Sequence, residues 1–212
     1  LRLGHDLPKQ YLPLAGVSLL RHSIETCLAH PRIDAVRCVI HPDDADLYAA
    51  AVAGLELLSP VAGGAQRQDS VRLGLESLEP IGPDAVLIHD AARPFLSPDL
   101  ITHTLDALGG ADGAIAAVPV HDTLKRGQDG CSMATVDRSG LWRAQTPQSF
   151  RFRAILGAHR SAIGQQLTDD AAVAERAGLR VALIPGSEDN IKITTPQDFD
   201  RAERLLAARH AV

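Results

Sequence analysis

The 212-residue sequence predicts an α/β fold in which a mostly parallel sheet is covered by helices on both faces. Short aliphatic runs that are typical of strands alternate with stretches whose apolar residues recur at helical spacing. Hydrophobic residues make up 45% of the chain but aromatic residues only 3%, so the core must consist mainly of Ala, Leu, Val and Ile. We therefore expect a single domain over residues 1–212.

The first half of the chain should begin with a loop over residues 1–15 and then alternate helices with strands. We expect helices over residues 19–30 and 42–53 and another that follows Gly63-Gly64 and runs to Leu78, with strands over 35–40, 55–58 and 85–89. Ser18 is a suitable N-cap for the first of these helices. Asp43 and Asp44 suit the start of the second, because carboxylates interact favourably with a helix N-terminus.

The second half continues the alternation but contains one stretch of a different kind. We expect helices over residues 99–108, 151–162, 169–177 and 196–209, and strands over 113–120, 180–184 and 190–193. Thr195 and Pro196 are well suited to begin the last helix. Residues 123–141 are polar and punctuated by glycine, which indicates a hairpin or arm outside the core.

Charge and cysteine content exclude several classes of function. A formal net charge of −5 argues against a surface that coats nucleic acid. Cys27, Cys38 and Cys131 are widely spaced and odd in number, which supports neither a zinc site nor a disulfide framework. No apolar run reaches the length of a membrane span, and no signal peptide opens the chain. We expect no membrane partner and a reducing, cytoplasmic location.

The strand expected at residues 85–89 ends in a group of residues that indicates a binding site. Asp90 and Arg93 follow it, separated only by two alanines, and ligands bind beyond the carboxyl ends of strands in open parallel sheets. His89 alternates with Asp90 and should point to the opposite face, where a structural role is favoured. The simpler interpretation of Asp90 and Arg93 is a solvated ion pair at the end of a strand.

Other polar groups interrupt apolar surroundings and favour a polyphosphate site. Lys192 lies between two isoleucines, and a lysine held inside a protein needs an anion. Gly63-Gly64 opens a helix that carries Arg67 and Ser70. The candidate cations are Arg2, Lys9, Arg93, Arg138 and Lys192, with Asp90 as the one well-placed carboxylate. Several cations without a nucleophile and base suit a polyphosphate with a divalent metal, because phosphoryl and nucleotidyl transfer depend on positioning and charge neutralisation.

Five motifs, taken as a set, resemble one enzyme family. They are Pro8-Lys9-Gln10-Tyr11-Leu12, His89-Asp90-Ala91-Ala92-Arg93-Pro94, Asp122-Thr123-Leu124-Lys125-Arg126, Asp137-Arg138-Ser139-Gly140-Leu141-Trp142 with Thr146-Pro147-Gln148, and Asp189-Asn190-Ile191-Lys192-Ile193-Thr194. In this order they resemble the 2-C-methyl-D-erythritol 4-phosphate cytidylyltransferases of the non-mevalonate isoprenoid pathway. The likeness covers essentially the whole chain.

The resemblance implies a Rossmann-like nucleotidyltransferase fold, a homodimer joined by a protruding β-arm at about residues 121–140, and a Mg²⁺-dependent reaction. That reaction transfers CMP from CTP to 2-C-methyl-D-erythritol 4-phosphate and releases pyrophosphate. It implies catalytic roles for Arg2 and Lys9 on the CTP phosphates and for Lys192 and Arg138 on the acceptor. It also implies cytidine contacts from Gly64, Ala65 and Ser70, metal binding by Asp90, and acceptor binding by Arg93, Thr123 and Thr146, with Thr123 and Arg138 reaching the partner subunit's site.

The sequence departs from the family pattern in two places. The family has a strand and a glycine-rich loop ahead of Pro8-Lys9-Gln10, of which only the tail, Leu1-Arg2-Leu3-Gly4, is present. An acidic residue often follows the two glycines, where this chain has Ala65.

Three alternatives remain open at this stage. The first is a cytidylyltransferase for another polyol phosphate, such as ribitol 5-phosphate. The second is a non-catalytic nucleotide-binding or scaffold protein. The third is the cytidylyltransferase half of a bifunctional enzyme, with a cyclodiphosphate synthase domain fused downstream.

Overall fold

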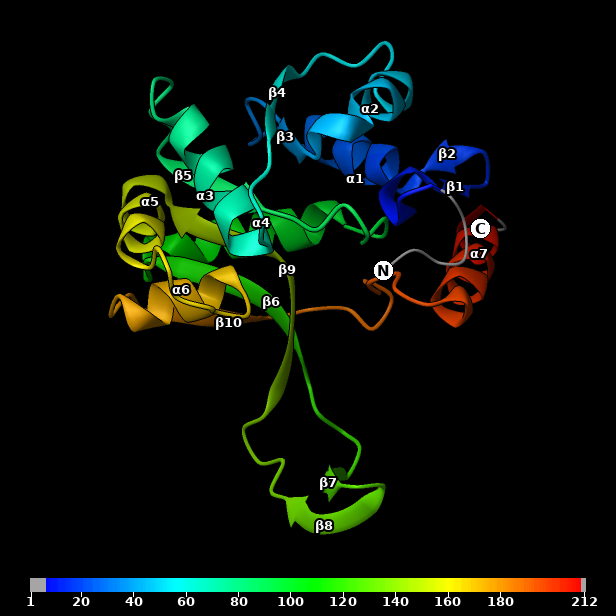
Figure 1. The fold of residues 1–212 in the computed structure, drawn as a ribbon, viewed down its shortest axis with the longest axis vertical. Helices are drawn as coiled ribbons and strands as arrows, with labels where there is room; N and C mark the ends of the chain where they lie inside the picture. Colours follow the sequence, from blue (N-terminus) through cyan, green and yellow to red (C-terminus); the bar gives the residue numbers. More distant parts are fainter. Residues whose placement is uncertain (1–6, 211–212) are drawn as a thin grey trace.

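A computed structural model describes residues 7–210, so the predicted catalytic Arg2 lies outside the described residues. Its centre is a four-stranded sheet in the order β10, β6, β9 and β5 (Figure 1). These strands span Val181–Pro185, Gly113–Pro119, Trp142–Arg151 and Ala85–Ile88. β10 is parallel to β6, whereas β9 is antiparallel to both β6 and β5.

The predicted α/β class with flanking helices is confirmed, but the sheet is mixed rather than mostly parallel. The reason lies in the connection between β6 and β9. The chain leaves β6, runs out into the arm and comes straight back as β9, and a direct return of this kind pairs two strands in opposite directions. No crossover helix intervenes to turn β9 parallel to β6.

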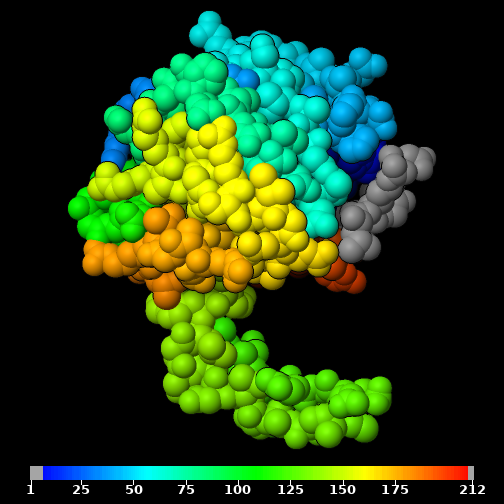
Figure 2. All heavy atoms as spheres, turned by 60° about the vertical axis from the view of Figure 1, so that its left-hand side comes forward, coloured from blue at the N-terminus to red at the C-terminus, as the bar shows by residue number. Residues whose placement is uncertain are grey.

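Smaller strand pairs complete the β-structure of residues 7–210. The pairs are β1 with β2, Pro13–Leu14 and Val17–Ser18, antiparallel; β3 with β4, Arg37–Ile40 and Leu58–Ala62, parallel; and β7 with β8, Leu124–Gln128 and Cys131–Val136, antiparallel. The β7–β8 hairpin forms the end of the arm, which stands well away from the body of the molecule (Figures 1 and 2).

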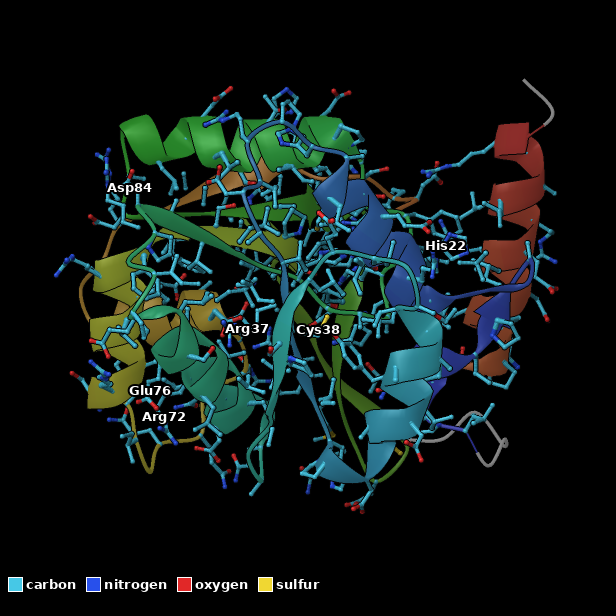
Figure 3. All side chains as sticks on the ribbon, turned by 90° about the horizontal axis from the view of Figure 1, so that it is seen from above. His22, Arg37, Cys38, Arg72, Glu76 and Asp84 are labelled. Carbon is cyan, nitrogen blue, oxygen red and sulfur yellow. The ribbon has the colours of Figure 1, made fainter. Side chains whose placement is uncertain are left out.

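Helices cover the two faces of the central sheet, as seen from above in Figure 3. The α-helices are α1 Leu19–Leu28, α2 Ala45–Ala51, α3 Arg67–Leu78, α4 Pro98–Asp106, α5 Phe152–Ser161, α6 Asp170–Arg176 and α7 Pro196–His210. Short 3₁₀ helices are η1 Lys9–Tyr11, η2 Pro42–Asp44 and η3 Ala107–Gly109.

The core lies on both sides of the sheet because successive residues of a strand point to opposite faces. In β6, Ile115 packs in a cluster with residues of α3, α5 and α6, whereas its neighbour Ala116 packs in a cluster with residues of α1 and α4. A third cluster, in which Leu14 and Ile193 are fully buried, fixes α7 against the start of the chain. Among the described residues, no helix combines the length and apolar character needed to cross a bilayer.

Most predicted helices and strands are present within a few residues of their expected bounds, with the exceptions named below. Ser18 caps α1, accepting a hydrogen bond from Arg21 N at 3.3 Å. The helix expected over 42–53 is split into η2 and α2, and the strand expected over 55–58 lies at Leu58–Ala62. Residues 190–193 form no strand, and β9 was not predicted as a strand.

Candidate active site

An ion pair between Asp90 and Lys192 forms the centre of the candidate site. Asp90 lies two residues after the end of β5, just before a turn at Ala91-Ala92, and its Oδ2 lies 2.6 Å from Lys192 Nζ. The segment that carries Lys192 is held to the turn by a hydrogen bond from Ile193 N to Ala92 O at 2.8 Å. Ile193 is fully buried, so the chain turns Lys192 the other way, toward the carboxylate.

Arg67, at the start of α3, supplies a second cation to Asp90. Its Nε lies 3.5 Å from Asp90 Oδ1, and the Asp90 side chain is only 17% exposed. Burial alone would raise the pKa of Asp90, but the hydrogen bond and charge of Lys192, with the charge of Arg67, outweigh it and lower that pKa. Asp90 is therefore a carboxylate throughout the neutral range.

Arg93 is a buried cation at the same turn. Its Nη1 donates a hydrogen bond to Asn190 O at 2.6 Å, and only 9% of the residue is exposed. Burial lowers the pKa of its guanidinium, and the nearby Asp90 opposes that effect. The Nε of Arg93 has no hydrogen-bond partner within the described part of the chain, which leaves a donor for an anionic ligand.

Lys9, in η1, brings a cation from the beginning of the chain. Burial lowers the pKa of Lys9, the positive charge of Lys192 lowers it further, and Asp90 and Asp198 oppose the shift. The two lysines therefore interact with each other and with the same carboxylate. Cations that repel one another in this way bind an anion strongly, because the anion relieves their repulsion.

His89 and Thr146 hold the turn that presents Asp90 and Arg93. Asp90 N donates to Thr146 Oγ1 at 3.0 Å, and Thr146 Oγ1 lies 3.0 Å from His89 Nδ1. His89 Nε2 lies 3.0 Å from Arg93 O, which can only accept, so Nε2 carries the hydrogen and Nδ1 accepts from Thr146. Burial lowers the pKa of His89 to about 4, so the imidazole is neutral and already bonded at both nitrogens.

These groups surround a small cleft of about 120 Å³. It is lined by Arg67, Asp90, Arg93, Ala144, Gln145, Thr146, Gln148, Thr168, Asp169 and Lys192. The predicted residues Asp90, Arg93, Thr146 and Lys192 therefore line one cleft, and Lys9 is close enough to interact with the Asp90–Lys192 pair.

The glycine turn before α3 lies next to Arg67. Gly64 N donates to Ser70 Oγ at 3.1 Å, and Ser70 Oγ donates to Gln66 O at 3.0 Å. A Cβ at Gly64 would lie 2.4 Å from Asp69 Cβ, so the turn requires glycine there. The Ser70 hydroxyl thus shapes the turn, and Gly64 and Ala65 are exposed.

Two predicted residues lie apart from this cleft, on the arm. Thr123 and Arg138 are exposed, and the Arg138 guanidinium donates to the carbonyl of His121 at the base of the arm. Figure 1 shows the arm leading away from the sheet that carries Asp90. Within one chain, these side chains do not join the group around Asp90.

Sequence reasoning did not select some residues of the cleft. Arg67 was noted beside the glycine turn, Gln148 within a family motif and Asp169 as the start of a helix, but none of them was chosen as a site residue. Gln148 is 1% exposed, and its Nε2 donates to Asp169 Oδ2 at 3.0 Å. The usable signal was the polar run Gln145-Thr146-Pro147-Gln148, which belongs to a buried strand.

A divalent cation fits this site only with help from a ligand. Within residues 7–210, no group of three or more His, Cys, Asp or Glu side chains could hold a metal ion. Mg²⁺ is commonly bound by one or two carboxylates together with substrate phosphates and water. Asp90 and the phosphates of a nucleotide would form such a donor set.

A sheet covered on both faces, with cations from four segments around one carboxylate at a strand's carboxyl end, is typical of α/β proteins that bind nucleotides or other phosphate compounds. Comparison with known proteins identifies the family to which this chain belongs. The chain belongs to the 2-C-methyl-D-erythritol 4-phosphate cytidylyltransferase family, whose model matches residues 1–208.

Similar proteins include one of nearly the same length as this chain and one about twice as long. A 2-C-methyl-D-erythritol 4-phosphate cytidylyltransferase of Cereibacter sphaeroides is 51% identical over 208 residues, covering 97% of this chain and 92% of that protein. A bifunctional enzyme IspD/IspF of Paramagnetospirillum magneticum is 59% identical over 205 residues, covering 97% of this chain but 53% of that protein. The chain thus spans about half the length of such bifunctional relatives.

The fold also matches solved structures. The crystal structure of a 4-diphosphocytidyl-2C-methyl-D-erythritol synthase from Anaerococcus prevotii superposes with a TM-score of 0.84 at 30% identity, covering 96% of this chain and 92% of that one. The predicted Rossmann-like nucleotidyltransferase fold agrees with this likeness.

Proposed function

We propose that this chain transfers CMP from CTP to 2-C-methyl-D-erythritol 4-phosphate, giving 4-diphosphocytidyl-2-C-methyl-D-erythritol and pyrophosphate, in isoprenoid precursor biosynthesis. The family supports this reaction. The observation that carries it is that Lys9, Arg93 and Lys192 all act on one partly buried carboxylate, Asp90. Such a site suits two phosphate compounds that must meet despite their mutual repulsion.

The reaction is an in-line displacement at the α-phosphorus of CTP. A phosphate oxygen of the acceptor forms the new P–O bond, while the bond from the α-phosphorus to the bridging oxygen breaks and pyrophosphate leaves. The nucleophile is already anionic near neutral pH, so the site needs no general base. This agrees with His89, whose two ring nitrogens are both engaged in holding the turn.

The cations would divide the work between the two substrates. Lys9, with Arg2, would bind the CTP phosphates and stabilise negative charge at the α-phosphorus. Arg93 and Lys192 would bind and orient the acceptor phosphate, with Thr146 beside them. The turn formed by Gly64, Ala65 and Ser70 would contact the cytidine.

Mg²⁺ is the proposed metal, and Asp90 is its protein ligand. When bound, the ion would neutralise phosphate charge and so lower the repulsion between the two substrates. Asp90 remains ionised at neutral pH, as a metal ligand must. Lys192 Nζ contacts Oδ2 of the same carboxylate, and its flexible side chain would exchange between Asp90 and a substrate phosphate.

We further propose that the protein is a homodimer joined through the arm, so that Thr123 and Arg138 act in the partner subunit's site. Met133 on the arm is 61% exposed, and Trp142, at the start of β9 beside the base of the arm, is 41% exposed. A hollow of about 540 Å³ at its base is lined partly by Leu141 and Trp142. Apolar surface of this kind supports an interface between chains. A cytoplasmic location is proposed from the three unpaired cysteines.

The test is a steady-state assay of pyrophosphate release with CTP and Mg²⁺. It is run with 2-C-methyl-D-erythritol 4-phosphate and, in parallel, with ribitol 5-phosphate. We expect release that depends on the first acceptor and is at least about tenfold less efficient with the second, the discrimination of roughly one well-placed contact. Equal rates, or a preference for ribitol 5-phosphate, would reject the assigned acceptor. CTP binding without release by either acceptor would support a scaffold.

A further inference from the structure

Arg67 lies between two carboxylates and is held more tightly by the one that is farther from the cleft. Its Nη2 is 2.7 Å from Asp170 Oδ2, whereas its Nε is 3.5 Å from Asp90 Oδ1. The Arg67 side chain is 36% exposed and lines the cleft, but the Asp170 side chain is only 1% exposed. The stronger contact therefore points into the protein.

Asp170 has a second buried neighbour, His159. His159 Nε2 lies 3.2 Å from Asp170 Oδ1, and the His159 side chain is 0% exposed. Asp170 begins α6 and His159 belongs to α5, so two packed helices hold this pair. A buried carboxylate is stable only when it is paired, which explains why Arg67 is drawn toward Asp170.

The backbone around Arg67 is fixed as well. The next residue, Gln68, donates from Nε2 to Ala162 O at 3.0 Å and accepts from Leu167 N at 3.1 Å. These two bonds fasten the first turn of α3 to the loop between α5 and α6. Arg67 is therefore restrained both at its main chain and at its guanidinium.

We propose that Arg67 is a positioning residue for the transfer reaction: Asp170, which also contacts His159, holds the guanidinium so that Arg67 faces Asp90 through Nε, 3.5 Å from Oδ1. The inference rests on the proposed function. Arginine and carboxylate groups commonly pair through two parallel hydrogen bonds. Without Asp170, Arg67 would be expected to take both oxygens of Asp90, including Oδ2, which now contacts Lys192. The contact between Asp170 and Arg67, called the tether below, thus leaves Oδ2 of Asp90 to Lys192.

Four variants test the tether by pyrophosphate release and by equilibrium unfolding. Arg67→Lys keeps the charge but cannot bridge two carboxylates, and Asp170→Asn keeps the shape but weakens the tether. Arg67→Lys/Asp170→Asn combines them. Arg72→Lys is the matched control, because Arg72 lies on the same helix but pairs with Glu76 of that helix, at 3.0 Å, and does not line the cleft (Figure 3).

We expect each single variant to lower kcat by about tenfold or more with little change in KM for CTP, a typical cost of misplacing a reacting group. The double variant should be no more than about threefold worse than Arg67→Lys, because Asp170 acts only through Arg67. Arg72→Lys should retain wild-type kcat. Near-wild-type kcat in Arg67→Lys, or losses that multiply in the double variant, would overturn the proposal.

Two further outcomes are also decisive. If Asp170→Asn does not fold, Arg67→Lys alone decides, since Arg67 is partly exposed. If the wild-type protein releases no pyrophosphate, the proposed function fails, and binding of pyrophosphate measured by calorimetry then tests the tether by itself. A roughly fivefold weaker affinity in Arg67→Lys would support it, as expected for one weakened charge contact. An unchanged affinity would reject it.

Discussion

Asp90 remains ionised in a place where burial alone would make it neutral, and this one carboxylate organises its surroundings. Lys192 and Arg67 contact different oxygens of its side chain, and Lys9 and Arg93 interact with its charge. Arg67, Arg93 and Lys192 line the cleft together with Asp90. The arrangement orders positive charge before any substrate arrives, which is how a preorganised site lowers a barrier between anions.

Removing Lys192 should therefore reduce turnover without unfolding the protein. We expect Lys192→Ala, and likewise Arg93→Ala, to lower kcat/KM for pyrophosphate release on the order of 10²-fold, the typical cost of one preorganised charge contact. Arg32→Ala is the control, because Arg32 forms an exposed ion pair with Asp106 away from the site residues. Wild-type kcat/KM in both Lys192→Ala and Arg93→Ala would reject their assignment.

His89 should make stability depend on pH. The pKa of His89 in the folded state is about 4, below its ordinary value of 6.5, because burial disfavours the charged ring. Between these values the unfolded chain binds more protons, so stability falls as pH falls and is fully present above about 6.5. A shift of this size corresponds to on the order of 3 kcal/mol over the whole interval.

Denaturant titrations at pH 7 and pH 5 would measure this effect. The loss of unfolding free energy between them should be smaller in His89→Gln than in the wild type. His41→Gln is the control, because the His41 side chain is 67% exposed. An equal loss in the wild type and in His89→Gln would show that His89 does not titrate on unfolding in this range.

Some residues of the site could be chosen from the sequence because they stand out from their neighbours. Lys192 lies between two isoleucines, and Asp90 and Arg93 follow an aliphatic run. Arg67 could not be chosen in this way, because its meaning depends on Asp170, about a hundred residues away, and on the packing of α5 against α6. Whether Gly64, Ala65, Ser70, Thr123 and Arg138 bind substrate stays a prediction.

At the scale of helices and strands, the ends of an element were predicted best where they depend on interactions between residues close in sequence. Ser18, predicted as an N-cap, does cap α1 by a side-chain hydrogen bond. β4 was misplaced because Pro60 argues against a strand, yet β4 is bonded only to β3 and so tolerates proline at its other edge.

β9 was missed because its buried residues are polar. Gln145, Thr146 and Gln148 are at most 7% exposed, and their hydrogen bonds reach other elements instead of solvent. The alternation that normally marks a strand is therefore absent. The opposite error occurred at residues 190–193, where Ile191 and Ile193 alternate with Lys192 but the backbone makes no strand pairing.

The contact between β6 and β9 depends on a glycine. A Cβ at Gly113 would lie 2.4 Å from Cδ1 of the fully buried Phe150, so Gly113→Ala must displace the ring. We expect a loss of about 1–3 kcal/mol in unfolding free energy, the usual cost of overpacking a core. Gly110→Ala is the control, because its Cβ would meet only an ordinary contact at 3.6 Å. Equal stability of the two variants would contradict this account.

At the scale of the whole molecule, the chain gathers one site from segments that are distant in sequence. η1, the start of α3, the turn after β5 and the segment before α7 each supply a cation. The sheet sets this convergence, since β5 ends where the segment before α7 returns to bond with Ala92. The predicted site residues on the arm, in contrast, do not reach this site within one chain.

The proposed dimer predicts that activity and assembly depend on the arm together. Replacing the exposed Met133 by Asp should place a charge in the interface and favour the monomer, as seen by sedimentation velocity. Lys125→Gln, on the same hairpin, is the control, because it changes polar surface only. A wild-type protein that sediments as a monomer at all concentrations would reject the dimer.

The two-stranded arm also has a consequence for how readily the protein is cleaved by proteases. An isolated two-stranded hairpin is only marginally stable and opens readily. The peptide bonds after Lys125 and Arg126, which lie in the β7–β8 hairpin, should therefore be accessible to trypsin. Packing of the arm against a second subunit would protect these bonds. Cleavage by trypsin should then slow as the protein concentration is raised. Rates of tryptic digestion across a dilution series would thus report whether the arm is buried in a dimer interface. This measurement requires no substrate.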